Sequence, residues 1–187
     1  MPELSEDLVA AGLCSHETIA RIARGLSAKG GGRITDALVL EGGLDEKAVL
    51  RVLALRAGTR FVTLEKLRAA KVEQDVLDRV PVRFAETQIA IPLKFDPATQ
   101  TLLIAAADPG NAAFVADLKI VSGVDNIVLL VALQRAIEAA IRRFYYGDVD
   151  AFEILAAETA PARQASPTGR DSVEASLSSI FKSQGKK

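Results

Sequence analysis

"GRITDALVLEGGLDEKAVLRV", residues 32–52, repeats the pattern of residues 2–22, "PELSEDLVAAGLCSHETIARI". The aligned pairs are Leu8 with Leu38, Val9 with Val39, Gly12 with Gly42, Ser15 with Asp45, Ile19 with Val49, and Ile22 with Val52. In each copy an apolar block, a glycine and a second apolar series at helical spacing follow one another. Each copy therefore predicts a helical hairpin.

The residues between the two helices of each copy support this prediction. Gly12 and Gly42 follow the first apolar block, and glycine readily adopts the backbone conformation that ends a helix. Ser15 and Asp45 are good N-cap residues for the second helix. Because one short hairpin buries little apolar surface, we expect two hairpins within residues 1–58 to pack on each other.

After this repeat the chain mixes strand and helix patterns. Residues 88–95 and 101–107 are apolar runs joined by "DPATQ", which favours a turn, and they predict a strand hairpin. Residues 126–132 predict a third strand. Helices are expected at residues 72–80, at 81–87, from about Asn111 to Gly123, and at 133–147. The expected fold class is α+β, in which the helical repeat precedes a small three-stranded α/β domain at residues 59–147.

The chain from Asp148 onward has a different composition. Ala, Pro, Ser and Thr dominate its first part, so a disordered linker and tail are expected over residues 148–187. Within it, residues 171–183 carry an apolar stripe that predicts a docking helix, made of Val173, Leu177, Ile180 and Phe181. Four buried apolar side chains do not offset the backbone entropy of a dozen ordered residues, so this helix is expected to fold only against a partner.

Composition excludes several classes of protein. The chain has 187 residues, of which 49% are hydrophobic, so most of it can fold. Its net charge of −1 gives no general attraction to nucleic acid. The start, "MPELSEDLV", lacks the basic and apolar regions of a secretory signal, and no apolar run approaches the length of a membrane span. A cytoplasmic protein is expected.

Catalytic and metal-binding motifs are not found in the sequence. His16 is the only histidine, which rules out multi-histidine metal sites, and its position after a helix cap indicates a surface residue. Cys14, the only cysteine, aligns with Leu44 and is expected to be a buried apolar residue rather than a nucleophile. The glycine-rich stretch "GLSAKGGGRIT" lacks the Gly-Lys-Ser/Thr of a P-loop. The sequence therefore predicts a protein that is not an enzyme and that binds no cofactor.

The order of these segments resembles the N-terminal domain of type II secretion and type IV pilus assembly ATPases, a family that includes cyclic-di-GMP-binding modules. The resemblance covers residues 1–147 and is carried by "RITDALVLEGGLDEKAVLRVLALRAG", "FVTL", "IPLKFDPATQTLLIAAADPGN", "LKIVSG" and "AIEAAIRRFYYG". Family members continue into a nucleotide-binding motor, whereas this chain continues into the linker and tail described above. The resemblance therefore implies a free-standing module without ATPase activity of its own.

The resemblance also implies a ligand site. In the binding members, two copies of an Arg-Leu-Gly unit hold one cyclic dinucleotide through arginines, terminal glutamines and apolar side chains. Here Arg33 matches the arginine of the second copy and Arg56 stands at its glutamine position. The other positions that match or approximate the motif are Leu4, Leu8, Val9, Gly12, Ile34, Leu38, Val39 and Gly42. Arginine suits such a site because its guanidinium offers a fork of donors to phosphate or guanine.

Several positions depart from the binding motif. Glu3 replaces the arginine of the first copy, and a carboxylate repels a phosphate. Ser5 and Thr35 replace glycines, and Leu26 replaces a glutamine. Each lost charge-assisted hydrogen bond costs about 1.5–3 kcal/mol, or roughly ten- to a hundredfold in affinity.

Weighing these departures, we expect a non-enzymatic adaptor. Its partner is expected to be a protein of a secretion, pilus or motility assembly, including the motor ATPase. The alternative is a cyclic-di-GMP receptor that binds the dinucleotide on the helical repeat.

Overall fold

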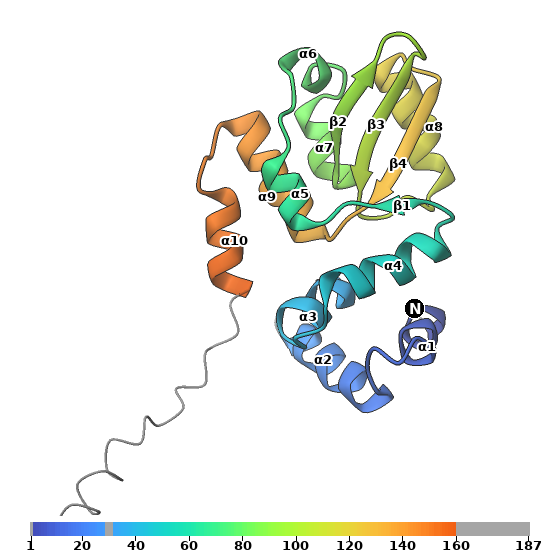
Figure 1. Ribbon diagram of the computed structural model, residues 1–187, viewed down its shortest axis with the longest axis vertical. Helices are drawn as coiled ribbons and strands as arrows, with labels where there is room; N and C mark the ends of the chain where they lie inside the picture. The colour runs from blue at the N-terminus through green and yellow to red at the C-terminus, as the bar shows by residue number, and fades with distance from the viewer. Residues whose placement is uncertain (1, 29–31, 160–187) are drawn as a thin grey trace, which may run out of the picture.

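The computed structural model describes residues 2–28 and 32–159. Within these ranges the protein is a mixed α and β structure, in which a group of helices precedes a small sheet (Figure 1). The predicted fold class is therefore confirmed. The predicted docking helix at residues 171–183, with Val173, Leu177, Ile180 and Phe181, lies outside the described residues. None of the described helices is long and apolar enough to cross a membrane.

The repeat forms four helices: α1 (Pro2–Ala10), α2 (His16–Ala28), α3 (Ile34–Leu40) and α4 (Glu46–Arg56). The two predicted N-caps are present. The Ser15 hydroxyl accepts a hydrogen bond from the backbone N–H of Thr18 at 3.2 Å, and the Asp45 carboxylate accepts one from Ala48 at 2.9 Å. These bonds satisfy donors that a helix leaves unpaired at its start. Each copy of the repeat is therefore one helical hairpin, as the spacing predicted.

The two hairpins share one apolar core. Its buried members are Leu8, Ile19, Ile22, Ala37, Leu38 and Val49. They come from all four helices, and two aligned pairs of the repeat, Leu8 with Leu38 and Ile19 with Val49, are among them. The duplication therefore creates a core that neither hairpin could form alone.

The second part of the chain is a four-stranded sheet with helices. Its elements are β1 (Arg60–Phe61), α5 (Leu64–Ala69), α6 (Gln74–Leu77), α7 (Val82–Gln88), β2 (Ala90–Asp96), β3 (Thr101–Ala106), α8 (Ala112–Ser122), β4 (Asn126–Val131) and α9 (Gln134–Tyr146). The strand order is β1-β4-β3-β2. Strands β2 and β3 form the predicted antiparallel hairpin, while β4 runs parallel to both β3 and β1.

The strand count corrects the prediction of three strands. The additional strand, β1, consists of Arg60 and Phe61, which pair with Leu130 and Val131 of β4. Two residues are too few to show the alternation that identifies a strand in a sequence. The hydrogen bond from the N–H of Val62 to the carbonyl of Val131, at 3.0 Å, extends this pairing. Its pairing with β4 adds this segment to the sheet, and that pairing is not visible in the local sequence.

A second correction concerns the segment after α9. The sequence predicted a linker from Asp148, but Ala151–Thr159 forms a further helix, α10, that packs against α9 (Figure 1). Phe152 and Leu155 are buried in the core of the sheet part. Their spacing places both on one face of a helix. The alanines of this segment suggested a linker by composition, whereas these two apolar side chains anchor it.

Among the described residues, the buried apolar side chains form two clusters. The helical repeat surrounds one, and the sheet with its helices surrounds the other, while Val39 and Leu53 pack against both. Because Val39 and Leu53 contact both cores, the packing does not define a domain boundary between residues 58 and 59. The predicted boundary therefore stays a prediction.

Candidate functional site

The junction between the second hairpin and the sheet contains the predicted arginine Arg33. This residue is the N-cap of α3, where its backbone is extended rather than helical. Its Nη1 donates a hydrogen bond to the carbonyl of Ala107 at 2.7 Å, just after the end of β3. Its Nη2 lies 3.9 Å from Oδ2 of Asp108. Arg33 therefore connects the repeat to the sheet.

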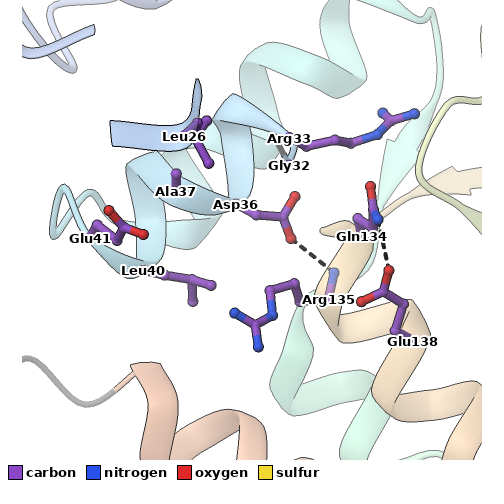
Figure 2. A pocket seen from close by; sticks show the side chains of 10 residues that line it. All are labelled: Leu26, Gly32, Arg33, Asp36, Ala37, Leu40, Glu41, Gln134, Arg135 and Glu138. Carbon is purple, nitrogen blue, oxygen red and sulfur yellow. Dashed lines mark hydrogen bonds between the residues drawn. The ribbon is translucent and has the colours of Figure 1, made fainter. Parts of the chain in front are cut away.

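Asp36, near the start of α3, makes a second connection. Its Oδ1 accepts a hydrogen bond from the backbone N–H of Arg135 at 2.9 Å, in the first turn of α9 (Figure 2). The N-cap of α9 is Leu133, whose side chain cannot accept a hydrogen bond. Asp36 thus caps a helix that lies 99 residues further along the chain.

The environment of Asp36 is unusual for a carboxylate. The residue is only 4% exposed, and burial raises the pKa of its carboxyl group above the ordinary value. Hydrogen bonds from the backbone of Arg135 and Gln134, and from the hydroxyl of Thr35, oppose this rise in pKa. The hydroxyl of Thr35 lies 3.4 Å from Oδ2. Thr35, which departs from the glycine of the family motif, is buried here beside the carboxylate.

Glu46, at the start of α4, makes a third connection of the same kind. Its Oε1 accepts a hydrogen bond from the backbone N–H of Leu64 at 2.7 Å, the first residue of α5. Burial raises the pKa of this carboxyl group as well. The second hairpin therefore provides a hydrogen-bond acceptor to the first turn of each of two helices in the sheet part, α9 and α5. Neither Asp36 nor Glu46 was selected from the sequence. For Asp36, the available signal was that Leu133, at the start of α9, has no side chain able to cap that helix.

Arg56 lies at the end of α4, on the far side of the same junction. Its Nη1 is 2.8 Å from Oδ2 of Asp7 in α1, and both side chains are about half exposed. A cleft of about 300 Å³ lies between it and Arg33. The lining residues of this cleft, which we call the arginine cleft, are Leu4, Arg33, Leu53, Arg56, Ala57, Asp108, Pro109 and Gly110.

The arginine cleft brings together three residues that were selected from the sequence for a ligand: Arg33, Arg56 and Leu4. Both guanidinium groups already face carboxylates, those of Asp108 and Asp7. A phosphate that entered the cleft would compete with these two acids. Since half-exposed ion pairs contribute only about 0–1 kcal/mol, the competition is weak.

The other residues selected for the ligand lie elsewhere. Leu8 and Leu38 are buried in the core of the repeat, and Val9, Ile34 and Val39 pack against that core. Gly12 adopts a left-handed conformation with φ of 69° in the turn after α1. Their predicted contact with a ligand stays a prediction, and the packing gives each a structural role. The side chain of Glu3 lies outside the described part of the chain.

Gly42 has a different reason to be glycine. A Cβ at this position would lie 2.4 Å from the carbonyl oxygen of Leu38 and 2.9 Å from Cδ1 of Ile22. The left-handed residue of the same turn is its neighbour Gly43, with φ of 66°. Gly42 therefore allows α2 and α3 to approach each other closely.

A second hollow lies on the other side of Arg33. It measures about 280 Å³ and lies between α3 and the start of α9, where Asp36 points to the backbone of Arg135 (Figure 2). The Nε2 of Gln134 donates a hydrogen bond to Glu138 at 2.7 Å on its rim. Acidic and basic side chains both line it, so it offers no selective attraction to an ion of either sign.

Cys14 and His16, which were considered for catalysis or metal binding, line neither the arginine cleft nor the hollow beside α9. Cys14 packs against the core of the repeat, and burial raises the pKa of its thiol, which lowers its reactivity. His16 is an exposed residue at the start of α2. Within residues 2–28 and 32–159, no group of three or more metal-ligating side chains occurs.

Comparison with known proteins identifies the family. The model of the MshEN domain matches residues 58–151, which is half of the chain. The protein belongs to the MshEN domain family. The match begins at the end of the repeat and covers the sheet, α9 and the start of α10.

A curated relative agrees with this assignment. The type IV pilus assembly ATPase PilB of Myxococcus xanthus (strain DK1622) is 34% identical over 142 residues, which are 76% of this chain. The matched region spans only about a quarter of that ATPase, 24% of its length.

Two solved structures share the fold. The structure of MshE with cdg has a TM-score of 0.55 at 22% identity, covering 76% of this chain and 98% of the other. The structure of the N-terminal domain of XpsE has a TM-score of 0.52 at 19% identity, covering 75% and 92% of the two chains. The predicted likeness to a module of secretion and pilus ATPases is thereby confirmed.

Proposed function

We propose that this MshEN protein is a non-enzymatic adaptor, which binds a protein of a type IV pilus, type II secretion or related assembly. Its likeness to a part of PilB and to the N-terminal domain of XpsE supports this proposal. The observation that favours it over ligand sensing is Glu3, which stands where the binding motif has its first arginine, because a carboxylate repels a phosphate.

Binding to purified assembly proteins of the host tests this proposal. Each component, including the motor ATPase, is passed over the immobilised protein, and binding is measured by biolayer interferometry. We expect at least one component to bind with micromolar or lower Kd, without added nucleotide. The protein is also expected to hydrolyse no ATP. The proposal fails if every component is without measurable binding or if the protein itself turns over ATP.

Cyclic-di-GMP binding is the second candidate function, and one observation favours it. The arginine cleft gathers Arg33, Arg56 and Leu4, the first two of which offer guanidinium groups to phosphate or guanine. The relative MshE has been solved with cdg, which we read as cyclic-di-GMP. On this proposal the dinucleotide displaces Asp7 and Asp108 from the two arginines.

Two substitutions separate the candidates. If the dinucleotide binds in the arginine cleft, Arg56→Ala lowers affinity about ten- to a hundredfold, since a charge-assisted hydrogen bond is lost. Asp7→Asn raises affinity up to about fivefold, because the competing carboxylate has gone. Isothermal titration calorimetry with cyclic-di-GMP measures both. Arg33 is unsuitable for this test because its side chain also bonds Ala107.

A control variant tests whether a loss of affinity is specific to the arginine cleft. Arg21→Ala removes an exposed arginine of α2 and is expected to leave affinity unchanged. Equal weakening by Arg21→Ala and Arg56→Ala would indicate non-specific attraction rather than a site. Absence of heat with the parent protein and with Asp7→Asn would eliminate the dinucleotide as a ligand.

A further inference from the structure

A third hollow, lined by none of the arginine-cleft residues, lies where α4, β1 and α5 meet. It measures about 380 Å³, and we call it the basic hollow. Its apolar lining includes Leu55, Phe61 and Ala54, and its charged lining consists of Arg51, Arg60 and Lys66. Figure 1 shows β1 passing between α4 and the rest of the sheet.

The charges of the basic hollow are all of one sign. Arg51, Arg60 and Lys66 are exposed, and among the described residues none of the three forms an ion pair. No acidic residue of the described chain lines the hollow. Three cations around one hollow produce a local positive potential although the whole chain has a net charge of −1. This potential favours an anionic occupant.

The apolar lining of the basic hollow favours an occupant with apolar side chains as well. Leu55 is 78% exposed, the second-highest exposure among the large apolar residues of the described chain. Arg51 and Leu55 are one turn apart on α4 and therefore lie on the same face of the helix. An exposed leucine among cations indicates a partner that is both acidic and apolar.

The strand edge indicates that the occupant is a polypeptide. Strand β1 is at the end of the sheet, with β4 on one side and no described strand on the other. The N–H of Val62 donates to Val131 of β4. Because backbone groups alternate in direction along a strand, those of Phe61 point away from β4. An extended segment that reached the backbone groups of Phe61 would find hydrogen-bond partners there in addition to the cations.

We propose that the basic hollow binds an extended acidic segment of a partner protein, which lies along β1. Its carboxylates pair with Arg51, Arg60 and Lys66, and its alternate apolar side chains cover Leu55 and Phe61. This inference rests on the proposed adaptor function for its biological meaning. Its test uses a defined peptide rather than assembly proteins, so the two proposals fail separately.

Fluorescence polarisation with a labelled octapeptide of alternating glutamate and leucine tests the proposal. We expect saturable binding that weakens at least tenfold in the variant Arg51→Glu, Arg60→Glu, Lys66→Glu, and at least threefold in Leu55→Ser. The matched control, Lys47→Glu, Lys71→Glu, Lys119→Glu, makes the same change of net charge at exposed positions outside the hollow. It is expected to bind within twofold of the parent.

Three results would overturn the proposal. The first is that the parent protein shows no saturable binding of the peptide. The second is that the two charge-reversal variants lower the affinity for the peptide equally. The third is that a competitor binds more tightly than the peptide through the same three cations. The competitors are vesicles of phosphatidylglycerol and a single-stranded oligothymidylate, which represent a membrane and a nucleic acid. Circular dichroism and thermal unfolding of each variant confirm that the surface changes leave the fold intact.

Discussion

Asp36→Ala is expected to lower the free energy of unfolding by about 0.5–2 kcal/mol, the typical cost of removing the side chain that caps a helix. The carboxylate accepts from the N–H of Arg135 at 2.9 Å and also from that of Gln134. Both donors belong to the start of α9, whose own N-cap, Leu133, has no acceptor. Urea denaturation at pH 7 measures the loss, and faster amide exchange at Gln134 and Arg135 locates it.

The variant Asp36→Asn separates the hydrogen bond from the charge. Its amide oxygen keeps one acceptor, so its loss of stability at pH 7 is expected to be smaller than that of Asp36→Ala. Burial raises the pKa of Asp36 in the folded state, so folding favours the protonated carboxyl group. The stabilisation linked to that proton is complete below the unfolded pKa and disappears as the pH rises through the raised folded pKa. Lowering the pH through this window is therefore expected to stabilise the parent protein relative to the Asp36→Asn variant, whose amide does not titrate.

An exposed aspartate provides the control. Asp117→Ala on α8 is expected to change stability by less than about 0.5 kcal/mol, because the side chain lies at the surface. If Asp36→Ala changed stability as little as Asp117→Ala, the helix cap between the two parts of the chain would contribute nothing. That result would also leave the buried carboxylate without a structural role.

Gly42→Ala is expected to destabilise the protein by about 1–3 kcal/mol, because the added Cβ meets atoms that cannot all move. The nearest atom is the backbone carbonyl oxygen of Leu38 at 2.4 Å, and the end of the Ile22 side chain follows at 2.9 Å. Displacing the carbonyl shifts the end of α3, and with it the buried Leu38. Thermal unfolding followed by circular dichroism measures the change.

Gly25 offers a matched control for this substitution. It lies inside α2, and a Cβ there would have no atom within 4 Å outside the backbone of its own helix and its chain neighbours. Gly25→Ala is expected to stabilise the protein by about 0.5–1 kcal/mol, because alanine loses less backbone entropy on forming a helix. Opposite signs for the two substitutions would support close packing at Gly42. Stabilisation by both would show that the turn after α3 has room for a methyl group.

Much of the fold could be predicted from short-range signals. The alignment of residues 2–22 with 32–52, the N-caps Ser15 and Asp45 and the glycines of the turns predicted two helical hairpins, which the structure confirms. The hairpin of β2 and β3 followed from two apolar runs around a turn. Each of these signals acts within a few residues, where the backbone itself limits the possible geometry.

The features that short-range signals missed depend on distant neighbours. Strand β1 has only two residues and exists through its pairing with β4. Helix α10 is held by Phe152 and Leu155 in the sheet core, although the composition around it is typical of a linker. Composition and periodicity describe a segment alone, whereas these segments are ordered by the surface on which they pack.

The candidate site illustrates the same division. The sequence was sufficient to select Arg33, Arg56 and Leu4, through the repeat and the family motif, but it did not show that they line one cleft. Nor did it show that Asp7 and Asp108 pair with the two arginines. Arg33 bonds Ala107 across 74 residues, and Asp36 bonds Arg135 across 99. Local residue patterns specify helices, strands and their caps, but the partners of these side chains depend on how the packed cores bring remote segments together.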